Sequence, residues 1–173
     1  CRWLLLVPHR IDNRPRVVAI LHELAERWRG RHPEDAERLA SATVANISYD
    51  FIENMRRLGV MDPALHQRAL FFWRERFFQD PHMAHDAEID GASEYAKACY
   101  EAGAILVYLT GRDLPNMALG SFASLRDLGF PIGVIGTELV VTVRVARHAQ
   151  RRRGRTYGVH VLLRAQRALA ASG

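Results

Sequence analysis

The feature that most constrains the fold of this sequence is an alternation of helical and strand patterns between residues 91 and 143. Residues 91–103 have helical spacing, and Ala104–Leu109 is an apolar run of strand length. A second helical pattern covers 114–128, and 131–143 contains one or two further strands. Parallel strands need crossover helices of this kind, so we predict an α/β fold with a parallel sheet.

The first half of the chain has a different organisation. A short apolar strand, Trp3–Val7, ends at a proline. Three helices follow without an intervening strand, and we expect them over 13–28, 33–58 and 62–78. Each begins near a proline or an acidic residue and then repeats apolar side chains at helical spacing. The helices therefore interrupt the α/β pattern as an inserted unit.

Charge is unevenly distributed along the 173 residues. The formal net charge is +5, but the last acidic residue is Glu138, and eight arginines follow it. The arginine cluster at 151–155 is typical of segments that contact the phosphates of a nucleic acid or another polyanion. A solvated arginine-rich segment is the alternative interpretation. We expect 144–173 to be disordered or to form a short amphipathic helix over 159–170.

Composition excludes several classes of protein. No apolar run approaches the roughly 20 residues of a membrane-spanning helix, so we expect no membrane insertion. The two cysteines, Cys1 and Cys99, cannot build a disulfide scaffold, and the N-terminal residues do not resemble a signal peptide. We therefore expect a cytoplasmic protein; its oligomeric state cannot be predicted from the sequence.

The strand at 104–109 is followed by Thr110-Gly111-Arg112-Asp113, which we interpret as a tight turn before the next helix. At the carboxyl end of a parallel strand, Thr110 and the backbone N–H of Gly111 would face the crevice where α/β proteins bind ligands. A hydroxyl and backbone amides at the start of a helix suit a phosphate. We therefore predict that Thr110, Gly111 and Arg112 bind phosphate. The alternative is that Thr110 is simply a turn residue.

Several segments around this element share a further pattern. They are Asp90-Gly91-Ala92, Tyr95-Ala96, Glu101-Ala102-Gly103-Ala104, Val107-Tyr108-Leu109-Thr110-Gly111-Arg112, Met117, Leu125, Leu128-Gly129-Phe130-Pro131 and, upstream, Asp12-Asn13-Arg14-Pro15-Arg16. Together they resemble the haloacid dehalogenase-like (HAD) phosphohydrolase superfamily, around its second motif and at the start of its helical cap. The resemblance covers residues 11–143.

This resemblance implies a Rossmann-like core of residues 1–12 and 88–143, interrupted by a helical cap of residues 13–87. It also implies hydrolysis of a small phosphorylated metabolite by an aspartate nucleophile, with Mg²⁺ as cofactor. That chemistry needs a nucleophilic carboxylate, a second carboxylate as acid and base, and a metal site. A threonine and an amide hold the transferring oxygens, which is the role that the resemblance gives to Thr110 and Gly111.

The family's first, third and fourth motifs are not recognisable in this chain. Where the first motif should supply two aspartates, the sequence reads Val7-Pro8-His9-Arg10-Ile11. Arg144 stands near the place of the family's lysine, and no acidic residue follows Glu138 to serve the fourth motif. Asp12 is the nearest candidate nucleophile, but its position matches better the acidic start of the helix after the first motif.

The sequence therefore predicts a HAD-like protein that is inactive or crippled as a hydrolase. We name Thr110 and Asp12 as candidate catalytic residues, Thr110, Gly111 and Arg112 as candidate phosphate ligands, and no metal ligand. A reading-frame shift near each end of the coding sequence would explain why the resemblance stops abruptly. The alternative function is a non-catalytic interaction protein whose Arg144–Arg155 segment binds nucleic acid or another polyanion.

Overall fold

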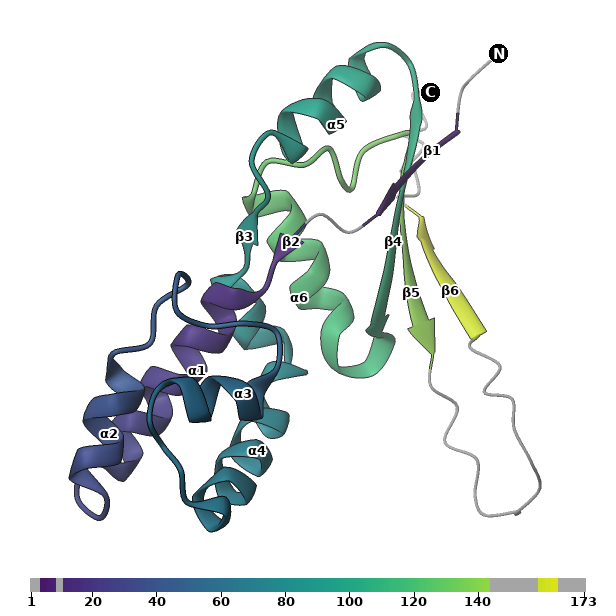
Figure 1. The fold of residues 1–173 in the computed structure, drawn as a ribbon. Coiled ribbons are helices and arrows are strands. Elements are labelled where there is room, and N and C mark those ends of the chain that lie inside the picture. The colour runs from purple at the N-terminus through teal and green to yellow at the C-terminus, as the bar shows by residue number, and fades with distance from the viewer. Residues whose placement is uncertain (1–3, 9–10, 144–158, 165–173) are drawn as a thin grey trace, which may run out of the picture. The chain divides into compact units, whose positions relative to one another are not determined.

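The computed structural model describes residues 4–8, 11–143 and 159–164. Contacts divide the chain into two compact units, which are shown in Figure 1. Unit 1 consists of residues 1–10 and 88–173, and unit 2 consists of residues 11–87. The sequence analysis predicts the two boundaries of the inserted helical unit after residues 12 and 87.

Unit 1 is built on a four-stranded sheet in the order β1-β4-β5-β6. The strands β1 (Leu4–Pro8) and β5 (Thr137–Val143) both pair in parallel with β4 (Ile105–Asp113). The last strand, β6 (Val159–Arg164), pairs antiparallel with β5. The parallel strands separated by helices confirm the predicted α/β class.

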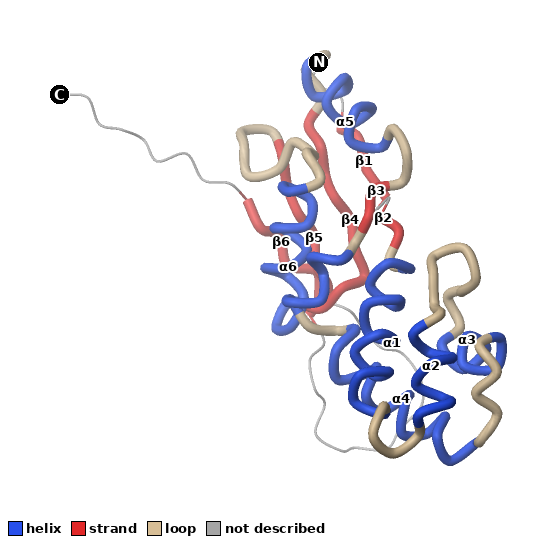
Figure 2. Tube along the Cα trace, turned by 90° about the vertical axis from the view of Figure 1, so that its left-hand side faces the viewer, coloured by secondary structure: helices blue, strands red, loops and turns tan. Residues whose placement is uncertain are grey.

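Two helices of unit 1 lie on the same face of this sheet (Figures 1 and 2). They are α5 (Ala92–Glu101) and α6 (Leu114–Asp127), which precede and follow β4 in the chain. Side chains of a strand alternate between its two faces. Leu106 and Tyr108 of β4 therefore point to one side, and they are 0% and 1% exposed.

Tyr108 fixes the segment after α6 over the sheet. Its hydroxyl donates a hydrogen bond of 2.9 Å to the carbonyl oxygen of Pro131, and its ring meets Phe130 edge-on at 6.0 Å between centroids. Burial raises the pKa of the Tyr108 phenol above its usual value. The contact identifies the face of β4 that carries Tyr108 as the one covered by the chain after α6.

Helices make up most of unit 2. Its helices are α1 (Arg14–Trp28), α2 (Pro33–Ala40), α3 (Phe51–Arg57), α4 (Pro63–Phe77) and the 3₁₀ helix η1 (Asp80–His85). Helix α1 packs against α2, α4 and η1, and α3 packs against α4. None of the helices that the structure describes is long and apolar enough to cross a membrane.

The chain enters and leaves unit 2 through two short strands. These are β2 (Ile11–Asp12) and β3 (Ala87–Glu88), which pair as a two-stranded sheet.

Unit 2 has a hydrophobic core of its own. Ile20, Leu21 and Leu24 lie on one face of α1 and are at most 1% exposed. They belong to a cluster of buried side chains that are all from unit 2 and include Leu39 of α2 and Met55 of α3. Each such side chain contributes about 1.5–3 kcal/mol when it is fully buried. The helices are therefore held together by their own apolar faces.

The single helix predicted over 33–58 is wrong, because the structure has two helices separated by residues 41–50. The connecting segment buries Ala42 and Ile47, which are 2% and 5% exposed. Apolar side chains of a non-helical segment can be buried as well, and in the sequence their spacing resembles that of a helix. The side chain of Asp50 then caps the start of α3.

One expectation for the C-terminal segment is also wrong. The sequence predicts disorder or a short helix over 159–170, but Val159–Arg164 form strand β6. Arg164 lies opposite Glu138 of β5 in the antiparallel ladder. A partner strand supplied by another part of the chain decides the conformation here, rather than local spacing. Residues 144–158 and 165–173 lie outside the described residues.

A buried ion pair joins the two ends of unit 2. Arg16, in the first turn of α1, donates through Nε and Nη2 to the carboxylate of Asp86, 70 residues away, with an Nε–Oδ1 distance of 2.7 Å. The two side chains are 1% and 0% exposed. Nη1 of Arg16 donates to the carbonyl oxygen of Phe77 at 2.9 Å. The pair therefore holds the beginning of α1 against the segment that leaves the unit.

We predict that Asp86→Asn destabilises unit 2 by about 3–5 kcal/mol, because it leaves the buried Arg16 guanidinium without its counter-charge. Urea unfolding followed by tryptophan fluorescence measures this loss, since two of the three tryptophans, Trp28 and Trp73, lie in unit 2.

The matched control is Glu26→Gln, which neutralises the carboxylate of an exposed ion pair. Glu26 lies in the last turn of α1, and its partner Arg29 directly follows the helix. Exposed pairs contribute little, so the unfolding midpoint should stay nearly unchanged. Equal losses in Asp86→Asn and Glu26→Gln would contradict the role given to the buried pair.

Candidate functional site

The predicted phosphate-binding element lies at an irregularity near the end of β4. The prediction of a tight turn is wrong here, because Thr110–Arg112 continue the strand to Asp113. Pairing on β4 passes from Leu109 to Asp113, whereas the partner strand β5 advances only from Val140 to Thr142. The three residues Thr110–Arg112 therefore form a bulge in the ladder. Bulges are common beside functional sites, where they redirect side chains.

The hydroxyl of Thr110 is held inside this bulge. The side chain is 7% exposed, and Oγ1 accepts a hydrogen bond of 3.3 Å from the backbone N–H of Arg112. A hydroxyl that accepts one hydrogen bond can still donate its own proton to another acceptor. This arrangement suits an oxygen-rich ligand such as a phosphate.

Gly111 is the exposed residue of the bulge. A Cβ atom added to it would meet no atom within 4 Å, and its φ is not positive. Glycine is therefore required at position 111 neither by steric crowding nor by the backbone conformation. The open space on the Cβ side of Gly111 leaves room for a ligand to approach the bulge.

Arg112 connects the bulge to the helix that follows. Its backbone N–H donates to Thr110, and its guanidinium Nη1 donates to Oγ of Ser121 on α6 at 3.2 Å. Ser121 is 0% exposed, and Arg112 is half-buried. The sequence gives no signal for Ser121, because a serine inside a helical pattern does not indicate which strand residue it meets. The structure thus brings Thr110, Gly111 and Arg112 together and adds Ser121.

Asp12, the other candidate catalytic residue, belongs to unit 2. Its carboxylate accepts hydrogen bonds from the backbone N–H, Nε and Nη2 of Arg14 at 2.9, 3.0 and 2.7 Å. The side-chain hydrogen bonds from Arg14 lower the pKa of Asp12. Both carboxylate oxygens therefore accept hydrogen bonds from Arg14, and the two side chains form an ion pair at the start of α1. The catalytic role of Asp12 stays a prediction.

We predict that Asp12→Asn lowers stability only where Asp12 is ionised. Because Arg14 holds the pKa of folded Asp12 below its ordinary 3.8, the ionised carboxylate stabilises the folded state above that pH. This contribution is lost as pH falls through the lower, folded pKa. Thermal unfolding between pH 2 and 6 should therefore show a small loss in the variant at about pH 6 that disappears near about pH 2. A loss of the same size at every pH would contradict the ion-pair explanation.

The residues present do not fit the Mg²⁺ site that the resemblance implies. Mg²⁺ in phosphate chemistry is held by carboxylates together with phosphate oxygens and water. In the part of the chain that the structure describes, no group of three or more His, Cys, Asp or Glu residues could hold a metal. In sequence, β1 ends at Pro8 and is followed by His9 and Arg10, and no acidic residue follows Glu138. The sequence at the ends of β1 and β5 therefore adds no carboxylate to Asp113 of β4, and a single carboxylate does not make the Mg²⁺ set that the resemblance implies.

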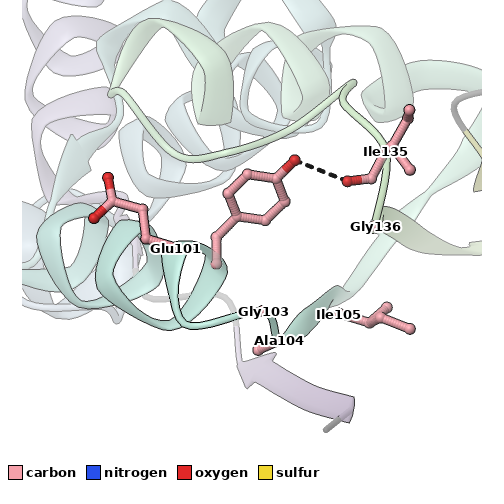
Figure 3. A pocket seen from close by; sticks show the side chains of 7 residues that line it. Glu101, Gly103, Ala104, Ile105, Ile135 and Gly136 are labelled. Atoms are coloured by element: carbon pink, nitrogen blue, oxygen red, sulfur yellow. Dashed lines mark hydrogen bonds between the residues drawn. The ribbon is translucent and has the colours of Figure 1, made fainter. Parts of the chain in front are cut away.

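A cavity of about 400 Å³ lies at the other end of the strands of unit 1 (Figure 3). The hydroxyl of Tyr100 donates to the carbonyl oxygen of Ile135 at 2.9 Å beside it. The cavity is lined by the end of α5 and the starts of β4 and β5, namely Tyr100, Glu101, Gly103, Ala104, Ile105, Ile135 and Gly136. The charged side chain among these is the carboxylate of Glu101, which would repel an anion. The bulge in β4 is therefore the better candidate for a phosphate.

The arginine-rich segment Arg144–Arg155, predicted to bind a polyanion, lies outside the described residues. A scan against protein-family models finds no match to this chain, and no curated protein or solved structure matches it either.

Proposed function

We propose that this chain is a HAD-like protein that binds the phosphoryl group of a small phosphorylated metabolite without hydrolysing it. The observation that carries the proposal is the bulge in β4, which contains a threonine hydroxyl, an exposed glycine and an arginine shortly before α6. The resemblance of the sequence to the HAD superfamily supports the same assignment.

The chemistry of the bulge supports binding. An anion is stabilised by backbone N–H groups at the start of a helix, where the helix dipole is positive. Helix α6 begins at Leu114, two residues after Arg112. The guanidinium of Arg112 adds a permanent positive charge with a planar set of donors that matches phosphate oxygens. Thr110 adds a hydroxyl donor.

The sequence at the end of β1 argues against hydrolysis by the route that the resemblance implies. In the parallel ladder Pro8, the last residue of β1, lies opposite Leu109, which directly precedes Thr110. The two residues that follow Pro8 in the sequence are His9 and Arg10, so β1 delivers no aspartate to this place. Covalent phosphoryl transfer of the expected kind needs a carboxylate nucleophile.

We predict that Gly111→Ala weakens the binding of inorganic phosphate by about tenfold, because the added methyl group occupies the open space from which a phosphate would reach the Gly111 N–H, and that interaction with a charged ligand is then weakened. The added methyl group meets only open space in the protein, so the fold should be unaffected. Isothermal titration calorimetry of the full chain with phosphate measures the affinity.

Gly30→Ala is the matched control, because a Cβ there also meets no atom within 4 Å and the glycine φ is not positive. It should bind phosphate as the parent does. Phosphate binding that is absent from the parent chain, or equal in parent, Gly111→Ala and Thr110→Val, would overturn the proposed site.

We predict that the purified chain does not hydrolyse a generic aryl phosphate in the presence of Mg²⁺. Release of the coloured phenol, measured alongside Thr110→Val, tests this. Turnover that disappears in Thr110→Val would contradict the non-hydrolysing proposal and would make Asp12 the first residue to examine as a nucleophile.

A further inference from the structure

Ser121 is a fully buried polar residue whose hydroxyl meets the candidate phosphate ligand Arg112. It lies in the middle of α6, nine residues after Arg112, and accepts a hydrogen bond of 3.2 Å from guanidinium Nη1. Its exposure is 0%, so this hydroxyl has no direct access to a ligand in solution. Its influence on a bound anion would therefore pass through Arg112.

Restricting Arg112 has a direct consequence for affinity. An arginine side chain has several rotatable bonds, and ordering such a chain on binding costs free energy. A contact that holds the guanidinium before the ligand arrives reduces that cost. Because the backbone N–H of Arg112 also donates to Thr110, one residue couples the hydroxyl of the bulge to the helix.

We propose that Ser121 is a positioning residue that orients Arg112 toward a phosphoryl group bound at the bulge. This inference rests on the proposed function and identifies a residue that acts on the ligand only through its neighbour. It also implies that the guanidinium of Arg112 is held in place before the phosphoryl group binds, rather than becoming ordered on binding.

Helix α6 carries a natural comparison for Ser121. Ser124 lies three residues later and is 6% exposed, and its Oγ has no hydrogen-bond partner among the described residues. Ser121→Ala and Ser124→Ala therefore remove the same atom from similarly buried positions of one helix. Only the first substitution removes a contact with Arg112.

The test is a double-mutant cycle on the affinity of the full chain for inorganic phosphate. Ser121→Ala should weaken binding by about two- to tenfold, the effect of losing one hydrogen bond, and Ser124→Ala should leave it unchanged. Arg112→Met should weaken binding more strongly. Adding Ser121→Ala to Arg112→Met should then have no further effect, because the positioned group is already absent.

A spectroscopic measurement separates positioning from general damage. The Arg112 Nε–H resonance, assigned by its disappearance in Arg112→Lys, should shift on addition of phosphate in the parent chain. In Ser121→Ala the same resonance should broaden or move before phosphate is added. An unchanged resonance in Ser121→Ala would overturn the inference.

Two binding outcomes would also overturn it: effects of Ser121→Ala and Arg112→Met that add independently, or an equal loss in Ser124→Ala. Failure of the proposed function has a different signature, in which Gly111→Ala and Thr110→Val leave phosphate binding unchanged. If those two variants lose binding while Ser121→Ala does not, the phosphate site stands and only the positioning role is rejected.

Discussion

The buried pair of Arg16 and Asp86 is the interaction on which the organisation of this chain depends. A strand of the sheet in unit 1 precedes residues 11–87, and its parallel partner follows them, so the inserted unit has to begin and end in one place. Closing such a long segment costs conformational entropy. The salt bridge, with the additional bond to the Phe77 carbonyl, joins the first turn of α1 to the segment before β3. A specific polar contact thus fixes the geometry of an otherwise apolar helical unit.

The candidate site combines groups that suit a bound anion with an incomplete set of reactive groups. The bulge in β4 supplies a hydroxyl, a backbone amide and a guanidinium, which suit the stabilisation of negative charge, whereas a threonine hydroxyl is a weak nucleophile unless a general base activates it. The aspartate nucleophile that the resemblance implies would have to come from the end of β1, where the sequence has His9 and Arg10. In the proposed function, binding and reaction are therefore separable properties, and the candidate site offers groups for binding alone.

The sequence predicted those features that depend on local patterns. Helices α1 and α4 have apolar faces and prolines in their first turns, and both were located closely. The errors arise where distant residues decide the structure. Ile47 is a buried side chain in the non-helical segment between α2 and α3, and in the sequence its apolar character indicates a helix. Strand β6 forms because β5 is available beside it. The contact of Ser121 with Arg112 depends on how α6 folds back over the strand, which composition and spacing do not encode.

The separate core of unit 2 has a thermodynamic consequence. Its cluster of buried side chains draws every member from residues 17–72, so the energy released on packing it belongs to that part of the chain alone. Because this core is confined to one of two compact units, we expect unit 2 to unfold as a cooperative element of its own, and an all-or-none transition then describes the whole chain poorly. A melting temperature for the whole chain would average over events that are physically distinct.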